Sequence, residues 1–363
     1  MQMLRTVARA AAAAALFALL AACSGEHAES EHHEGKLTVR GAGATFPKPL
    51  YERWIEAYGA EAPDVAFDYA GVGSGKGVKL FLAGKDPAGE IFEGASVHFG
   101  ASDAAMSDAE IAEADKGDGV VMVPTTGGIV VLAYNMPGIT DLKLSREAVA
   151  GIFSGAITRW DDERIAASNP GIDLPKTTLT PVVRRDGSGT TFILTSHLAA
   201  ANPEWRDGPG VGKRIDWPGG AMEVNYNSGV AQRILVSEGS IGYTEFEFAE
   251  RLGLSVAALE NKAGEIVQPS QAAGTAALQS APEVPADLRV FVPDPPGADA
   301  YPIVSYTWLL LRGRYDNAQI RDALKAAVLW GLTDGQAIAA DMGYIPLPED
   351  MVRLARAKLD DIH

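Results

Sequence analysis

Four turns of the chain place small residues and a hydroxyl or carboxylate side chain directly after an apolar run. They read GAGATFP from residue 41, GVGSGKG from 71, FGASDA from 99 and RRDGSGTT from 184. A glycine-rich turn that leads into a helix presents unpaired backbone N–H groups and the positive end of the helix dipole, which together favour a tetrahedral oxyanion. One such turn is commonplace, because Ser and Thr are ordinary N-caps. Four of them, one with an arginine, predict an anion site if they meet at the carboxyl ends of strands in an open α/β sheet.

The second turn resembles a nucleotide-binding P-loop, whose pattern is G-x-x-x-x-G-K-[ST]. Aligned on Gly75 and Lys76, the pattern requires glycine at position 70 and a hydroxyl at position 77, whereas the chain has Ala70 and Gly77. Without that hydroxyl there is no side-chain ligand for magnesium. We therefore reject an ATPase or GTPase.

A nucleophilic hydrolase is the second enzyme to consider, because Ser74 and Ser188 lie in glycine-rich turns. Neither serine lies in a G-x-S-x-G elbow. Beyond residue 33 the only histidines are His98, His197 and His363. The first two fall within expected strand or helix packing, so nothing in the sequence supports a catalytic triad.

Residues 1–22 have the composition of a secretion signal, with Arg5 and Arg9 before the apolar run AAAAALFALLAA. The run is too short for a resident membrane-spanning helix. Cys23 follows LAA, which resembles the lipobox of bacterial lipoproteins. We therefore expect cleavage before Cys23, lipidation of its thiol and a flexible polar tether over residues 23–35. Cys23 is the only cysteine, so no intramolecular disulfide can form.

The chain is acidic, with 31 basic and 47 acidic residues and a net charge of −16. Loss of the signal peptide would remove two arginines and no acids. Nonspecific nucleic-acid binding is excluded on this ground, and any anionic ligand must be captured by local geometry against a repulsive field. The tether histidines His27, His32 and His33 are expected to be solvated, so we expect no metal or other cofactor.

From Lys36 onwards, short apolar runs alternate with helical stretches, which is typical of an α/β domain. Strands are expected at 37–43, 65–71, 97–103, 127–136, 179–185 and 303–313. Helices are expected at 49–63, 77–84, 106–115, 146–155, 231–239 and 317–333. The helix at 106–115 should begin with a capping box formed by Ser107 and Glu110. Residues 252–300, rich in Ala, Pro and Gly, are expected to form a connecting region.

Eight segments resemble, in order, the PstS family, the phosphate-binding proteins of bacterial phosphate ABC importers. They are GAGATFPKPLYERW, GVGSGKGVK, FGASDAAMS, GGIVVLAYNMPG, ITRWDDERIAASNPG, VVRRDGSGTTFILTSHL, GSIGYTEFEFA and GYIPLP, between about residues 39 and 348. The most specific are GAGATFP, FGASDA and RxDGSGT.

The resemblance implies an α/β, two-lobed type II periplasmic binding protein fold with two hinge crossings and the ligand in the cleft between the lobes. We expect crossings near 125–130 and 300–305, so that lobe I comprises residues 36–127 plus 302–363 and lobe II comprises 128–301. It also implies the residues that contact phosphate. These are Ala44, Thr45, Phe46, Ser74, Asp103, Arg184, Ser188, Gly189 and Thr190, with Asp186 pairing with the arginine.

The residue types explain how such a site selects its anion. Hydroxyls, backbone amides and Arg184 donate hydrogen bonds and would hold sulfate as well as phosphate. An ionised Asp103 only accepts, so it can face an oxyanion only where the anion presents an O–H, as phosphate does near neutral pH and sulfate does not. Unpaired buried acceptors cost several kcal/mol, which corresponds to on the order of 10³-fold in affinity.

The chain departs from the family pattern in two places. Gly75 and Lys76 follow Ser74 where another small hydroxyl and then glycine are more usual, and Arg185 stands where a small residue is often found. Either cation could raise the local potential or pair with surface carboxylates, and we favour the surface role.

The sequence therefore predicts an extracytoplasmic, lipid-anchored, monomeric protein that binds inorganic phosphate and delivers it to the permease subunits of an ABC importer. It is not expected to be an enzyme. Receptors for sulfate, arsenate or molybdate remain an alternative, followed by an exported phosphatase and by an adhesin on a binding-protein scaffold.

Overall fold

The computed structural model describes residues 35–217, 220–281 and 284–363. The predicted signal peptide, the predicted lipidation site Cys23 and the histidines of the predicted tether lie outside the described residues. Within the described ranges, no helix is both long enough and apolar enough to cross a membrane.

Twelve strands are described, and the predicted α/β class is confirmed by their alternation with helices. The strands are β1 (Leu37–Gly43), β2 (Val65–Gly71), β3 (Phe99–Ser102), β4 (Val121–Tyr134), β5 (Lys143–Leu144), β6 (Thr180–Arg184), β7 (Met222–Val224), β8 (Ser240–Glu245), β9 (Ser255–Val256), β10 (Ala258–Glu260), β11 (Ile266–Val267) and β12 (Val304–Leu311).

Three of the predicted site residues, Ser74, Gly189 and Thr190, lie in the first turns of helices. The helices are α2 (Lys48–Glu61), α3 (Ser74–Ala83), α4 (Asp108–Ala114), α5 (Arg146–Phe153), α6 (Glu163–Ala166), α7 (Gly189–Ala201), α8 (Pro203–Asp207), α9 (Tyr226–Val236), α10 (Phe246–Arg251), α11 (Gln271–Gln279), α12 (Ala318–Gly331), α13 (Gly335–Asp341) and α14 (Glu349–Lys358), with a final 3₁₀ turn, η1 (Leu359–Asp361).

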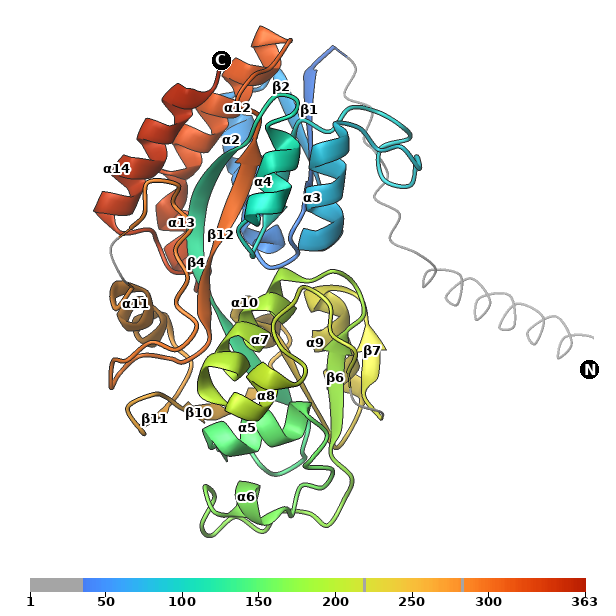
Figure 1. The fold of residues 1–363 in the computed structure, drawn as a ribbon, viewed down its shortest axis with the longest axis vertical. Helices are drawn as coiled ribbons and strands as arrows, with labels where there is room; N and C mark the ends of the chain where they lie inside the picture. The colour runs from blue at the N-terminus through green and yellow to red at the C-terminus, as the bar shows by residue number, and fades with distance from the viewer. Residues whose placement is uncertain (1–34, 218–219, 282–283) are drawn as a thin grey trace, which may run out of the picture. The chain divides into compact units, whose positions relative to one another are not determined.

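The main sheet runs in the order β2-β1-β3-β12-β4-β8-β6-β7, with β9 added to β4. Its long strands β4 and β12 lie side by side in Figure 1. Strands β2, β1 and β3 are parallel to one another, as are β8, β6 and β7. Between these two parallel groups, β12 and β4 pair in antiparallel fashion. Strands β11, β10 and β5 form a separate small sheet.

Strand β4 belongs to both halves of the main sheet. Its residues up to Ile129 pair with β12, and its residues from Val130 onwards pair with β8. All fourteen residues of β4 are buried, as expected for a strand covered on both faces. The first half of the sheet therefore holds the ends of β1, β2 and β3, and the second half holds the end of β6.

Local sequence signals located several elements correctly. Strands β1 and β2 have the predicted bounds, and the predicted capping box of α4 is confirmed, because Ser107 and Glu110 bond each other's backbone N–H groups. The expectation for residues 252–300 was wrong, since this region contains β9, β10, β11 and the nine-residue helix α11. Helix α11 was missed because its sequence, QAAGTAALQ, is small and weakly patterned.

Helix α3 begins earlier than predicted, at Ser74 rather than Gly77. Its N-cap is Gly73, whose φ of 84° is a conformation that disfavours other residues. At Gly77, an added Cβ would overlap the Cα of Gly43 and come within 2.9 Å of the carbonyl oxygen of Ala42. The helix thus packs directly on the backbone of β1, and the hydroxyl side chain that a P-loop requires at this position has no room.

We expect Gly77→Ser to lower the free energy of unfolding by about 1–3 kcal/mol, because an overpacked contact between helix and strand must be relieved by backbone shifts. Gly59→Ala in α2 is the matched control, since an added Cβ there meets nothing within 4 Å. That control should stabilise the protein by about 0.5–1 kcal/mol. Urea unfolding measures both, and equal effects of the two substitutions would contradict the packing argument.

Candidate functional site

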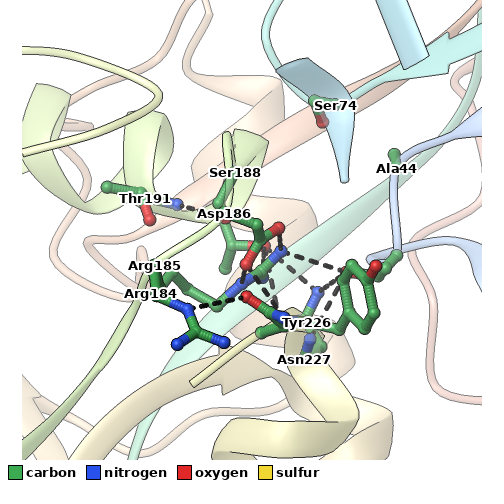
Figure 2. A network of polar contacts seen from close by, with 12 residues as sticks. Ala44, Ser74, Arg184, Arg185, Asp186, Ser188, Thr191, Tyr226 and Asn227 are labelled. Carbon is green, nitrogen blue, oxygen red and sulfur yellow. Dashed lines mark hydrogen bonds and ion pairs between the residues drawn. The ribbon is translucent and has the colours of Figure 1, made fainter. Parts of the chain in front are cut away.

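Arg184, the last residue of β6, forms a buried ion pair with Asp186. Its side chain is 1% exposed. The guanidinium donates from Nε to Oδ1 of Asp186 at 2.7 Å and from Nη2 to Oδ2 at 2.6 Å (Figure 2). Burial opposes ionisation of Asp186, but the hydrogen bonds and charge of Arg184 outweigh it, so the pKa of Asp186 is lowered. The two residues therefore form a charged pair in the folded protein.

The same guanidinium joins the turn after β1 to the turn after β6. It donates to the hydroxyl oxygens of Thr45 and Thr190, at 3.4 Å in both cases. Asn227, in the first turn of α9, donates from Nδ2 to these two hydroxyls at 2.9 and 3.2 Å. Thr45 and Thr190, which are 145 residues apart in the chain, are thus brought together around one arginine.

Asp103 lies directly after β3 and is 2% exposed. Its Oδ1 accepts a hydrogen bond from the Thr307 hydroxyl at 2.9 Å, and its Oδ2 accepts one from the Ser74 hydroxyl at 3.2 Å. Burial raises the pKa of Asp103 to about 7, against the opposing effects of the Thr307 hydrogen bond and the charge of Arg184. Near neutral pH this carboxyl group is therefore poised to exchange a proton.

The second, third and fourth turns pack against one another through glycines. An added Cβ on Gly189 would lie 2.5 Å from Oγ of Ser74 and 2.6 Å from Cβ of Asp103. The N–H of Gly75 donates to the carbonyl oxygen of Gly187 at 2.7 Å. All four predicted turns therefore meet at one place, although Ser74 contacts Asp103 and is not bonded to Arg184.

Five backbone N–H groups at this meeting point have no acceptor among the residues that the structure describes. They belong to Thr45, Phe46, Ser74, Gly189 and Thr190. All five residues are buried, and buried N–H groups normally have a partner. Ser74 and Gly189 are also the first residues of the ten-residue helix α3 and the thirteen-residue helix α7. Donors at helix N-termini favour an anionic acceptor.

The remaining predicted residues occupy supporting positions. Ala44 is buried and donates its N–H to Ala101 within the sheet. Ser188 is the N-cap of α7 and accepts from the N–H of Thr191. Ser188 thus holds the helix start with its hydroxyl oxygen while its hydroxyl hydrogen stays available to donate.

The two unusual cations lie at the surface. Lys76 pairs with Glu90 at 2.6 Å between two exposed side chains, as the surface interpretation predicted. Arg185 is also exposed, but its partner is the amide oxygen of Asn225 at 3.5 Å and not a carboxylate.

Sequence reasoning missed Asn227, Thr307 and Tyr226. The N–H of Tyr226 donates to Oδ1 of Asp186 at 3.0 Å, which completes the support of the ion pair. An asparagine in a helix and a threonine in an apolar strand carry no local signal of such a role. Only the contact with a residue far along the chain reveals it.

The described histidines do not serve the serines of the site. Nδ1 of His98 accepts from the N–H of Arg40, and Nδ1 of His197 lies 3.0 Å from the carbonyl oxygen of Pro293. Burial lowers the pKa of each to about 4. Within the described part of the chain, no group of three or more His, Cys, Asp or Glu side chains is arranged to hold a metal ion.

Comparison with known proteins identifies the class. Residues 28–329 match the model of the PBP superfamily domain. A high-affinity periplasmic phosphate-binding protein bound with phosphate superposes with a TM-score of 0.73 and 25% identity, covering 88% of this chain and 93% of the other. The arrangement is the two-lobed, type II periplasmic binding protein fold that the sequence predicts.

Two relatives are more similar in sequence. The phosphate-binding protein PstS of Methanocaldococcus jannaschii is 36% identical, covering 88% of this chain and 84% of the relative. The protein of the same name from Pasteurella multocida is 34% identical, covering 88% of this chain and 89% of the relative. The chain belongs to the PstS family.

The raised pKa of Asp103 predicts a pH dependence of stability. The folded protein binds this proton with a pKa of about 7, against 3.8 as the ordinary value of the carboxyl group. Between these values the folded state holds more protons than the unfolded state, so the contribution of Asp103 to stability falls as the pH rises from about 4 to about 7. Asp103→Asn removes this pH-dependent loss. As the pH rises from about 4 to about 7, the free energy of unfolding of the variant should therefore increase by about 2–4 kcal/mol relative to that of the unmodified protein. Urea unfolding in buffers without multivalent anions, at pH 4.5 and 8, measures the difference, and parallel profiles would contradict it.

Proposed function

We propose that the protein binds inorganic phosphate between its two lobes and delivers it to the permease of an ABC importer. The observation that carries the proposal is the set of five buried N–H donors without a protein acceptor beside the guanidinium of Arg184. Such donors fit an anion with several acceptor oxygens. Membership of the PstS family and the phosphate-bound relative support phosphate as that anion.

The proposed contacts are those implied by the family resemblance. Phosphate is bound by Ala44, Thr45, Phe46, Ser74, Asp103, Arg184, Ser188, Gly189 and Thr190, and Asp186 orients Arg184. The meeting of the four turns and the orphan N–H groups support this set. No cofactor is required for binding of this kind.

Asp103 is proposed to select phosphate over sulfate. With a pKa of about 7, its carboxyl group is mostly ionised at pH 8 and then only accepts hydrogen bonds. Monohydrogen phosphate offers an O–H to this acceptor, whereas sulfate places an oxygen against it. Below pH 7 a protonated Asp103 can donate, so discrimination against sulfate should weaken.

Closure of the lobes is proposed to accompany binding, because a ligand that contacts both lobes biases the closed state. We propose lobe I as residues 36–127 plus 302–363 and lobe II as 128–301. The exchange of partners along β4 after Ile129 supports a crossing there. Two ion pairs also join the proposed lobes, Lys213 to Glu110 at 3.0 Å and Arg289 to Asp108 at 2.6 Å.

The decisive experiment is calorimetric titration of the lipid-free protein with phosphate and sulfate at pH 8. Phosphate should bind on the order of 10³-fold more tightly, because sulfate leaves buried acceptors unpaired. Asp103→Asn should narrow this gap, since an amide can donate to sulfate. Tighter binding of sulfate would overturn the proposal in favour of another oxyanion receptor, and unchanged discrimination in the variant would remove the role of Asp103.

Arg184→Ala and Arg185→Ala form a matched pair in the same titration. Arg184 is buried and Arg185 is exposed, so only the first should weaken phosphate binding strongly, while the second changes affinity by less than about threefold. The opposite order would overturn the assignment of the ligand arginine.

We further propose that the protein is a non-catalytic monomer, exported and anchored to a membrane by lipid on Cys23. His98 and His197 contact backbone groups of Arg40 and Pro293, which supports binding without hydrolysis at Ser74 or Ser188. Cys23→Ser should abolish incorporation of radiolabelled fatty acid and release the protein from the membrane fraction, because the anchor needs that thiol. Labelling that persists in the variant would contradict the anchor.

A further inference from the structure

We propose that Asn227 is a positioning residue that forces the hydroxyl groups of Thr45 and Thr190 to donate to the bound anion. This inference rests on the proposed function. It adds a residue that contacts two of the proposed phosphate-binding side chains but does not itself bind phosphate. Asn227 is completely buried. It lies in the first turn of α9, beside the buried pair of Arg184 and Asp186 (Figure 2).

The orientation of the Asn227 amide is determined by its neighbours. Its Oδ1 accepts from the backbone N–H of Glu245 at 3.1 Å and from the hydroxyl of Thr244 at 3.3 Å. A backbone N–H can only donate, so the atom that faces it must be the amide oxygen. The Nδ2 group therefore faces the other way, and its two hydrogens are directed to Thr45 and Thr190.

Both threonine oxygens consequently accept hydrogen bonds from Asn227 and from Arg184. Oγ1 of Thr45 accepts three hydrogen bonds. Two come from Asn227, from Nδ2 at 2.9 Å and from the backbone N–H at 3.4 Å, and the third comes from Arg184 at 3.4 Å. Oγ1 of Thr190 accepts from Nδ2 at 3.2 Å and from Arg184 at 3.4 Å. Its own hydrogen has a long contact, 3.4 Å, to Oδ1 of Asn227, an oxygen that also accepts from the N–H of Glu245, and the hydroxyl leaves this contact when it donates to an anion.

A hydroxyl has two acceptor lone pairs and one hydrogen. Once both lone pairs are occupied by donors, the hydroxyl can interact with a ligand only by donating. The hydroxyls of Thr45 and Thr190 thus require ligand oxygens that accept, and an unprotonated oxygen is the stronger acceptor. Asp103, at the other side of the meeting point, requires an oxygen that carries one. Asn227 therefore favours the orientation in which unprotonated oxygens of the anion face the two threonines and the protonated oxygen faces Asp103.

The backbone beside Asn227 indicates that this placement is maintained against strain. Tyr226 has φ of 69°, a conformation that few residues other than glycine adopt. In this conformation the N–H of Tyr226 donates a hydrogen bond to Asp186. One strained turn therefore positions both the ion pair of Arg184 with Asp186 and the side-chain amide of Asn227. Strained residues persist only where the surrounding structure compensates for them, and they cluster at functional sites.

The first test compares Asn227→Asp with Asn225→Asp. Both add one negative charge to the same turn, but Asn225 contacts the exposed Arg185 and not the threonines. A carboxylate at position 227 keeps the shape and the bond to the N–H of Glu245, yet it only accepts, so both threonine hydroxyls turn towards it and away from the ligand. In calorimetric titration with inorganic phosphate at pH 8, N227D should lose about 100-fold or more in affinity, because two hydrogen bonds to a charged ligand are lost. N225D should lose less than about threefold.

The second test separates positioning from a general structural role. Asn227→Ala is measured in the unmodified protein and in a background with Thr45→Val and Thr190→Val, which lack the hydroxyls. It should weaken phosphate binding about tenfold or more in the first case and less than about threefold in the second, because Asn227 acts through those hydroxyls. If N227A fails to fold, Asn227→Leu, which is close to asparagine in size and adds no charge, is measured in both backgrounds in its place.

The outcomes are distinguishable. The role of Asn227 would be overturned if Asn227→Ala lowered phosphate affinity equally in both backgrounds, or if N227D and N225D lowered it equally. In either case, phosphate binding by the unmodified protein would leave the proposed function intact. Absence of phosphate binding by the unmodified protein would overturn the proposed function and the role of Asn227 together.

Discussion

The buried guanidinium of Arg184 is the group on which the rest of the site depends. A cation at 1% exposure is tolerated only when it is paired and its N–H groups have acceptors, because removal from water costs several kcal/mol. Asp186 meets that requirement with two short hydrogen bonds, and it is held in turn by the N–H of Tyr226. The pair is close to neutral as a unit. An anion at this place is therefore bound mainly by N–H and O–H dipoles together with the remaining N–H groups of the arginine.

The sheet supplies the geometry that such dipoles need. The turns after β1, β2, β3 and β6 lie in two halves of one sheet that share β4, so they meet although their residues come from distant parts of the chain. Glycines allow the backbones to approach closely. At Gly77 the helix α3 lies on β1, and at Gly189 the helix α7 lies on Ser74 and Asp103. A side chain at either position would separate groups that must face one ligand.

Specificity in this arrangement arises from the direction of hydrogen bonds more than from charge. The chain is acidic overall, so its long-range field does not favour any anion. On one side of the meeting point, Arg184 and Asn227 donate to the hydroxyl oxygens of Thr45 and Thr190. On the other side, Asp103 accepts from Ser74 and Thr307, and burial keeps its pKa near neutrality. Under the proposed function, an anion with one protonated oxygen satisfies both sides at once, whereas a fully deprotonated anion satisfies only one.

The sequence by itself determined the features that depend on neighbours along the chain. Alternation of apolar residues was sufficient for β1 and β2, and the Ser107 and Glu110 pair was sufficient for the start of α4, because caps and strands obey short-range rules. The four glycine-rich turns were sufficient to predict which segments form the candidate site. The tertiary structure decided what depends on distant contacts. It brought Asn227 to Thr45 and Thr307 to Asp103 across 182 and 204 residues, and it left Lys76 with Glu90 at the surface. It also raised the pKa of Asp103, since burial is a property of the packed fold and not of any local segment.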